Sequence, residues 1–100
     1  PMSRAPRLFL VCYDVRDPKR LRRVYKVMRG FGDHVQFSVF RCVLSETQLA
    51  RMEGRLLREI NCNEDQILVV PLGLASVPAE ERMHTLGQPL LDAERVVRIL

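Results

Sequence analysis

An acidic residue ends the apolar segment at residues 8–15, directly before a segment that is crowded with arginine. The acid is Asp14, and the basic residues begin at Arg16. Carboxylate oxygens are ligands that magnesium prefers, and arginine pairs with the oxygens of phosphate groups. Together the two features indicate a site that holds a divalent cation against a phosphodiester. The structural alternative is a strand-end aspartate that caps the following turn, and the residues alone do not decide between the two.

The basic charge of the chain is concentrated between residues 16 and 29. This segment holds seven basic residues and one acid, a net charge of +6, whereas the whole chain carries +4, so the remaining residues sum to −2. Clustering of this kind is typical of a surface that binds nucleic-acid phosphates, although a basic helix can also be only a solvated face. Fourteen of the sixteen basic residues are arginine, which favours phosphate binding. The predicted nucleic-acid-binding residues are Arg16, Lys19, Arg20, Arg22, Arg23, Lys26 and Arg29.

A strand and a helix position these residues. The apolar run at 8–15 predicts a buried strand, and Asp17 followed by Pro18 predicts the start of a helix. Gly30 and Gly32 predict its end. The face of this helix that packs on the core is predicted to consist of Leu21, Val24, Tyr25 and Met28.

Further elements follow along the chain. The alternating run 34–44 predicts either one long strand or two short ones with a break near Ser38. Ser45 and Gln48 form a capping box for a second helix, and residues 65–72 predict another strand. Short strands are predicted at 82–86 and at 96–100. The core face of the second helix is predicted to be Leu49, Met52, Leu56, Leu57 and Ile60.

This order of elements predicts an α+β fold, a ferredoxin-like two-layer sandwich in which two helices pack on one face of a sheet. We expect one domain over residues 1–100, with a core at about 7–73 and a dimerisation tail at 77–100. A C-terminal strand that has no pairing partner within its own chain predicts strand exchange in a homodimer. Three cysteines without CxxC spacing predict free thiols and a cytoplasmic location. The apolar runs are too short to span a membrane.

Four segments resemble the small endoribonuclease of the CRISPR adaptation module, the second-numbered family of CRISPR-associated proteins. The match covers residues 8 to about 72. The segments are Tyr13-Asp14-Val15, Leu21-Arg22-Arg23-Val24-Tyr25, the run 32–40 and Glu64-Asp65-Gln66-Ile67.

The resemblance implies a homodimer in which Asp14 faces its symmetry mate and binds magnesium, with manganese as the alternative. It also implies a metal-dependent endonuclease that cleaves RNA or DNA, and partnership with the CRISPR integrase in acquiring new spacers. An arginine is expected to steady the phosphate under attack. Arg23 is the first choice and Arg22 the alternative, while Tyr13, Ser38 and Phe40 would shape the floor of the site.

Two other functions stay open on the sequence: a non-catalytic DNA-binding adaptor of the integrase, and a toxin-like relative that cleaves mRNA. His34 and His84 are expected to be surface or turn residues, and Asp65 to fix a turn. Aromatic residues are scarce outside the predicted core, which holds Tyr25 and Phe31. We therefore expect contacts to the nucleic-acid backbone, not stacking on bases.

Overall fold

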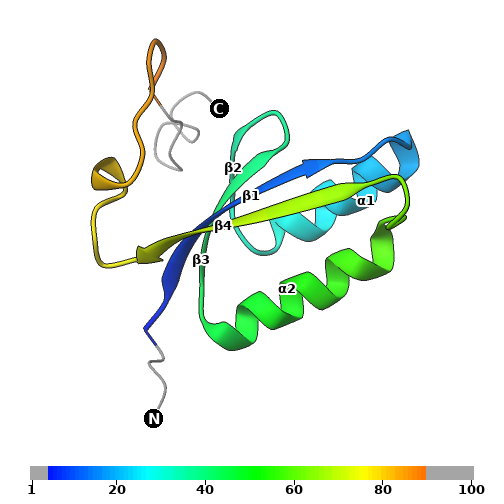
Figure 1. Cartoon of the computed structure of the whole chain (residues 1–100), viewed down its shortest axis with the longest axis horizontal. Coiled ribbons are helices and arrows are strands. Elements are labelled where there is room, and N and C mark those ends of the chain that lie inside the picture. Colours follow the sequence, from blue (N-terminus) through cyan, green and yellow to red (C-terminus); the bar gives the residue numbers. More distant parts are fainter. Residues whose placement is uncertain (1–4, 90–100) are drawn as a thin grey trace.

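The computed structural model describes residues 5–89, which form a four-stranded sheet with two helices (Figure 1). The elements follow the chain as β1 (Arg7–Asp14), α1 (Pro18–Arg29), β2 (Asp33–Gln36), β3 (Val39–Leu44), α2 (Glu46–Glu59) and β4 (Gln66–Leu74), with a short 3-10 helix η1 (Ala79–Glu81). The strand order is β2-β3-β1-β4, and all neighbouring strands are antiparallel. This confirms the predicted α+β, ferredoxin-like fold.

Both helices begin where side-chain caps place them. The Asp17 carboxylate accepts a hydrogen bond from the Arg20 backbone N–H at 2.9 Å, and Pro18 follows it at the first helical position. The capping box of α2 is formed by Ser45 and Gln48, each of which accepts from the backbone N–H of the other. These bonds satisfy N–H groups that the first helical turn leaves without partners. The two predicted helix starts are confirmed.

The run 34–44 forms two strands with a tight turn at Phe37 and Ser38 between them. The Ser38 carbonyl accepts a hydrogen bond from the Tyr13 N–H at 3.0 Å, which ties this turn to the end of β1. Gly32 precedes β2 at a close approach: a Cβ there would come to 2.5 Å from the Arg41 carbonyl oxygen and from the Cys42 Sγ. Only glycine fits at this position without a shift of its neighbours.

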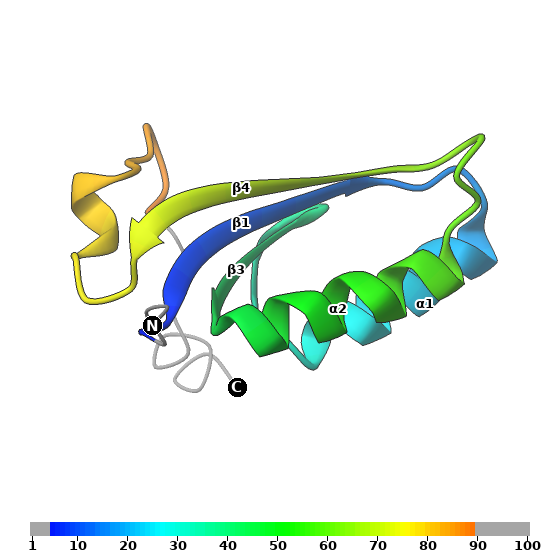
Figure 2. The ribbon, with the colours of Figure 1, turned by 60° about the horizontal axis from the view of Figure 1, so that its bottom comes forward.

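The sheet buries one face against the helices, and no helix of residues 5–89 covers the other face (Figure 2). The core lies between the buried face and the helices and consists of Phe9, Val11, Tyr13, Val15, Val24, Val27, Met28, Phe40, Cys42, Leu44, Met52 and Leu56. The opposite face is called here the open face. It carries Leu10, Cys12, Asp14, Val39, Arg41, Val43, Gln66, Leu68 and Val70, because alternate residues of a strand point to opposite sides.

Two predictions about individual elements are wrong. Leu57 is 61% exposed and does not belong to the core. Residues 82–86 form turns and irregular backbone, not a strand. Pairing of β1 with β4 continues past Pro71 to Leu74 with an irregular register, and the missing N–H of Pro71 is tolerated because β4 is an edge strand. The predicted strand at 96–100 lies outside the described residues.

The cysteines of the described residues are free thiols, as predicted. Cys42 is fully buried in the core, and burial raises its pKa to about 11. Within the described part of the chain, no helix is both long enough and apolar enough to span a bilayer.

Candidate nucleic-acid and metal site

The residues predicted to form one site are divided between the two faces of the sheet. Tyr13 and Phe40 point into the core beneath the helices, where Tyr13 is 6% exposed and Phe40 is fully buried. Asp14, the next residue along β1, therefore points to the open face and is exposed. Phe40 and Tyr13 stack with ring centroids 6.2 Å apart. Tyr13 and Phe40 pack beneath the strand that carries Asp14, but their side chains lie on the opposite face of the sheet from the Asp14 carboxylate.

The Asp14 carboxylate forms no hydrogen bond or ion pair with the part of the chain that the structure describes. The turn after β1 is capped by Asp17 and Asp65 instead, so Asp14 does not fill the structural role that was its alternative. In the register of β1 and β4, Asp14 lies directly opposite Gln66, which is also exposed. Directly opposed side chains lie on the same face, with Cβ atoms about 5 Å apart.

Asp14 and Gln66 offer side-chain oxygen atoms that can bind a metal ion at this end of the open face. Among residues 5–89 there is no group of three or more His, Cys, Asp or Glu side chains that would hold a metal ion. Magnesium keeps several waters and is commonly held by one or two carboxylates, so a single carboxylate per chain fits this ion once a second copy contributes another. The sequence did not reveal Gln66, because only the strand register brings it opposite Asp14.

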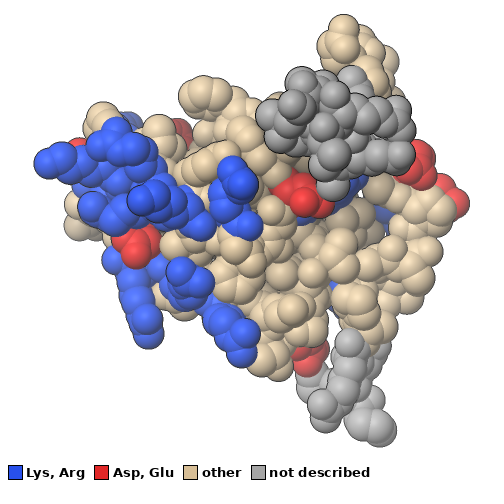
Figure 3. All heavy atoms as spheres, turned by 180° about the vertical axis from the view of Figure 1, so that it is seen from behind, with Lys and Arg blue, Asp and Glu red and all other residues tan. Residues whose placement is uncertain are grey.

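The basic residues of α1 separate into paired and unpaired groups. Arg20 donates to Asp65 at 2.8 Å and pairs with Glu64 at 3.0 Å, and Arg23 pairs with Glu59 at 3.1 Å. The side chains without an ion pair to the described residues are Arg16, Lys19, Arg22, Lys26 and Arg29. Basic side chains gather at the end of the molecule that lies at the left in Figure 3. The unpaired cations are the ones available to phosphate.

Arg22, the alternative to Arg23, lines a surface hollow of about 440 Å³ that also includes Tyr13 and Ser38. Helix α1 contributes Leu21, Arg22, Tyr25 and Lys26 to this hollow, and the strand ends contribute Tyr13, His34, Phe37 and Ser38. We call it the α1 hollow. Burial, with a smaller effect of Tyr25, raises the pKa of the Tyr13 phenol.

Asp65 joins the loop after β1 to the loop before β4, a larger role than the turn predicted for it. Its carboxylate accepts hydrogen bonds from the backbone N–H groups of Arg16 at 3.0 Å and Asn61 at 2.8 Å, and from the Arg20 guanidinium. The side chain is fully buried. The hydrogen bond from Arg20, with the two backbone donors, holds the pKa of Asp65 well below its ordinary value.

Replacing Asp65 with Ala should lower the melting temperature by about 10 °C, because Arg20 and two backbone N–H groups lose their acceptor. The depressed pKa means that this stabilisation is present above the unfolded carboxyl pKa of about 4 and is lost as the pH falls below it. The difference in melting temperature between wild type and variant should therefore shrink below about pH 4. Thermal unfolding followed by circular dichroism measures both effects.

Glu64→Ala is the matched control, since it removes the exposed partner of the same arginine. An exposed ion pair contributes little, so this variant should melt within about 2 °C of wild type. Equal losses for the two variants would contradict the anchoring role of Asp65.

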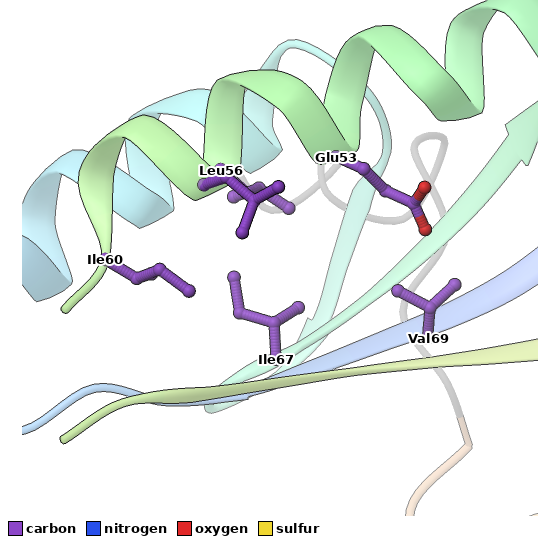
Figure 4. Close-up of a pocket in the computed structure, with 6 residues that line it drawn as sticks. Glu53, Leu56, Ile60, Ile67 and Val69 are labelled. Carbon is purple, nitrogen blue, oxygen red and sulfur yellow. The ribbon is translucent and has the colours of Figure 1, made fainter. Parts of the chain in front are cut away.

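A second hollow, of about 270 Å³, lies between α2 and β4 (Figure 4). Leu56, Ile60, Ile67 and Val69 surround it, and Glu53 is the one acid at its edge among the residues that line it. This lining offers no donor set for a metal and no cation for a phosphate. The hollow therefore serves as a control region and not as a candidate site.

Comparison with known proteins shows similarity to one family. The family model described as CRISPR associated protein Cas2 matches residues 7–77. A CRISPR-associated endoribonuclease Cas2 of Rhodospirillum rubrum is 37% identical over 101 residues, covering 98% of this chain and 95% of that protein. Another, of Thermodesulfovibrio yellowstonii, is 44% identical over 64 residues, covering 64% of this chain and 70% of that protein. The crystal structure of Streptococcus pyogenes Cas2 superposes with a TM-score of 0.70 at 35% identity, covering 80% of this chain and 99% of that chain.

Proposed function

This chain belongs to the CRISPR-associated Cas2 family, whose relatives are named endoribonucleases, and on that basis we propose that it cleaves nucleic-acid phosphodiesters with Asp14 as its metal-binding carboxylate. The observation that supports the proposal most is the state of Asp14. It is an exposed acid at a strand end, without an ion pair or hydrogen bond to the described residues, on a sheet face that no helix covers. An uncompensated carboxylate of this kind is suited to a cation.

Magnesium is the proposed metal, with manganese as the alternative. Asp14 would hold it, together with Asp14 of a second copy, and the amide oxygen of Gln66 is a further oxygen donor within reach. When bound, the metal would lower the pKa of a coordinated water and neutralise charge on the phosphate. The chain supplies the carboxylates and, from Arg22 and its neighbours, positive charge that holds the nucleic acid.

A second copy is proposed to cover the open face. Leu68 is 54% exposed and Val43 is 51% exposed there, and both lie beside further apolar residues of β1 and β3. Exposed apolar patches of this kind mark interaction surfaces. Association through this face places Asp14 inside the interface, where a symmetry mate can complete the donor set. The exchange of a C-terminal strand remains a further part of the proposal.

The non-catalytic adaptor is the second candidate function, and one observation favours it. Arg22 and Lys26 lie on the helix side of the sheet, whereas Asp14 points to the open side. A nucleic acid bound along α1 is thus not presented to Asp14 of the same chain. Partnership with the CRISPR integrase is part of both candidates and is supported by family membership alone. Family membership also disfavours the toxin-like alternative.

The double variant Arg22→Glu/Lys26→Glu tests the basic face. We expect it to weaken binding to RNA and duplex DNA by at least about 10-fold at moderate salt. It should also make the slope of log K against log salt shallower by about two, because two phosphate contacts are lost. Fluorescence anisotropy over a series of KCl concentrations measures both quantities.

Arg51→Glu/Arg58→Glu is the control, with the same change in charge at two exposed arginines of α2 that form no ion pair with described residues. It should leave the slope unchanged. Equal losses for the two double variants would show that only net charge matters and would contradict binding along α1.

A further inference from the structure

Phe37 is unusual among the aromatic residues because its side chain is 86% exposed. It stands in the tight turn between β2 and β3 and lines the α1 hollow. An exposed phenylalanine at a turn contributes nothing to the core, so a packing role does not explain it. The sequence-based expectation was that aromatic residues are scarce on the surface, which argued against stacking on bases, and the exposure of Phe37 is an exception to it.

A hydrogen bond from His34 links the turn that carries Phe37 to residues that pack on the core. The Nε2 atom of His34 donates a hydrogen bond to the Phe37 carbonyl at 3.2 Å; a carbonyl only accepts, so this nitrogen carries a proton. The His34 ring packs against Phe40, with centroids 4.9 Å apart, and edge-on against Tyr25 at 5.3 Å. Phe40 is fully buried. The position of the Phe37 backbone is therefore fixed to the core while its ring stays in solvent.

Two basic residues of α1 line the same hollow as Phe37. Arg22 and Lys26 stand one turn apart on α1, both line the α1 hollow, and neither forms an ion pair with the described residues. Helical residues four apart lie on the same face. Arg22, Lys26 and Phe37 thus border one surface hollow, whose lining is mainly apolar.

This pairing matches the chemistry of one nucleotide. A nucleobase has a flat apolar face that stacks on aromatic rings, and its phosphate binds arginine and lysine. A hollow of about 440 Å³ lies within the range of small-molecule sites. A base paired inside a duplex cannot offer its face to an aromatic ring, whereas an unpaired base can.

We propose that the α1 hollow binds one unpaired nucleotide, with its base stacked on Phe37 and its phosphate bound by Arg22 and Lys26. The proposal rests on the proposed nucleic-acid binding along α1 and adds a preference for strands with unpaired ends. RNA and DNA share the required chemistry of a base and a phosphate. The site lies on the helix side of the sheet and is separate from Asp14.

The experiment compares Phe37→Ala with wild type on three probes: a blunt DNA duplex, the same duplex with unpaired thymidine tails, and that duplex with unpaired uridine tails. The variant should bind tailed duplexes about 10-fold more weakly, because stacking on one base is lost. Its affinity for the blunt duplex should stay within about two-fold. Phe37→Tyr keeps an aromatic ring and should restore the tail-dependent affinity.

Leu57→Ala is the matched control, since Leu57 is also exposed but borders the apolar hollow between α2 and β4. It should bind all three probes as wild type does. A loss confined to thymidine or to uridine tails would assign the site to DNA or to RNA, and a loss on both supports the shared chemistry. Unchanged affinity of Phe37→Ala for both tails, or an equal loss on the blunt duplex, would overturn the proposal.

Together, the two sets of variants show whether the nucleotide site in the α1 hollow fails by itself or whether binding of nucleic acid along α1 fails as a whole. If binding along α1 is wrong, Arg22→Glu/Lys26→Glu will bind the blunt duplex with wild-type affinity and salt dependence. If only the nucleotide site is wrong, that double variant will still lose blunt-duplex affinity while Phe37→Ala shows no difference between tailed and blunt probes.

Discussion

Replacing Asp14 with Asn should reduce magnesium-dependent cleavage of RNA by about 100-fold or more. Asn keeps the size of the side chain and one oxygen but removes the negative charge that holds a hard cation. A metal ion supplies several kcal/mol of charge stabilisation in phosphodiester cleavage, so its loss corresponds to two or more orders of magnitude in rate. Asp14 has no hydrogen bond or ion pair among the described residues, so the fold should not change.

Asp17→Asn is the control for this experiment. It makes the same chemical change three residues away, where the carboxylate caps α1, and Asn caps a helix as well as Asp does. Its cleavage rate should equal that of wild type. Binding of RNA, measured separately by anisotropy in the absence of metal, should be the same for both variants and for wild type. Cleavage that persists in Asp14→Asn would contradict the role of Asp14 as metal ligand.

The Asp14→Asn variant also distinguishes cleavage from the non-catalytic adaptor function. If the chain acts only as an adaptor, spacer acquisition in cells should continue with Asp14→Asn. If cleavage is required, acquisition should be lost together with it. Arg22→Glu/Lys26→Glu should impair acquisition under either function, because both need the nucleic acid to be held.

The local elements around the site were predictable from the sequence because their signals lie within a few residues. Asp17 with Pro18 placed the start of α1, and Ser45 with Gln48 placed the start of α2. Helical spacing also identified the core face of α1, whose Val24 and Met28 are fully buried. Hydrogen bonds between neighbours in the sequence decide the helix starts, and the spacing of apolar residues along the helix decides its core face.

The arrangement of the site was less predictable, because contacts between distant residues decide it. Alternation along β1 separates Tyr13 from Asp14, but the sequence does not show which of the two faces the helices. The pairing of Arg20 with Asp65 joins residues 45 positions apart, and the pairing of Arg23 with Glu59 joins the two helices. These contacts leave Arg22, not Arg23, beside Tyr13 and Ser38. Similarly, helical spacing admits Leu57 to the core face of α2, whereas its exposure depends on how the helix packs on the sheet.

The largest effect on assembly is expected from Leu68→Gln on the open face. Leu68 is 54% exposed and lies opposite Cys12, beside the pair of Asp14 and Gln66. In a two-fold dimer each substitution acts twice. Losing the apolar contact and burying an amide costs roughly 1–3 kcal/mol per copy, so the dimer dissociation constant should rise by about 30-fold or more. Size-exclusion chromatography with light scattering over a dilution series measures this change.

Leu57→Gln provides the comparison, because Leu57 is 61% exposed but lies on α2, away from the open face. It should leave the dimer intact. Neither substitution adds charge, and an exposed position costs the fold of the single chain little stability, so both variants should keep the wild-type circular dichroism spectrum. A Leu68→Gln protein that stays dimeric on dilution would contradict association through the open face.

The monomeric variant also tests whether the metal site needs two copies. At concentrations where Leu68→Gln is monomeric and wild type is dimeric, cleavage by the variant should fall as far as it does in Asp14→Asn, since each copy contributes one carboxylate. Raising the protein concentration until Leu68→Gln dimerises should then restore cleavage, whereas no concentration should restore it in Asp14→Asn. A monomer that cleaves at the wild-type rate would place the complete donor set within one chain and would make Gln66 the partner of Asp14.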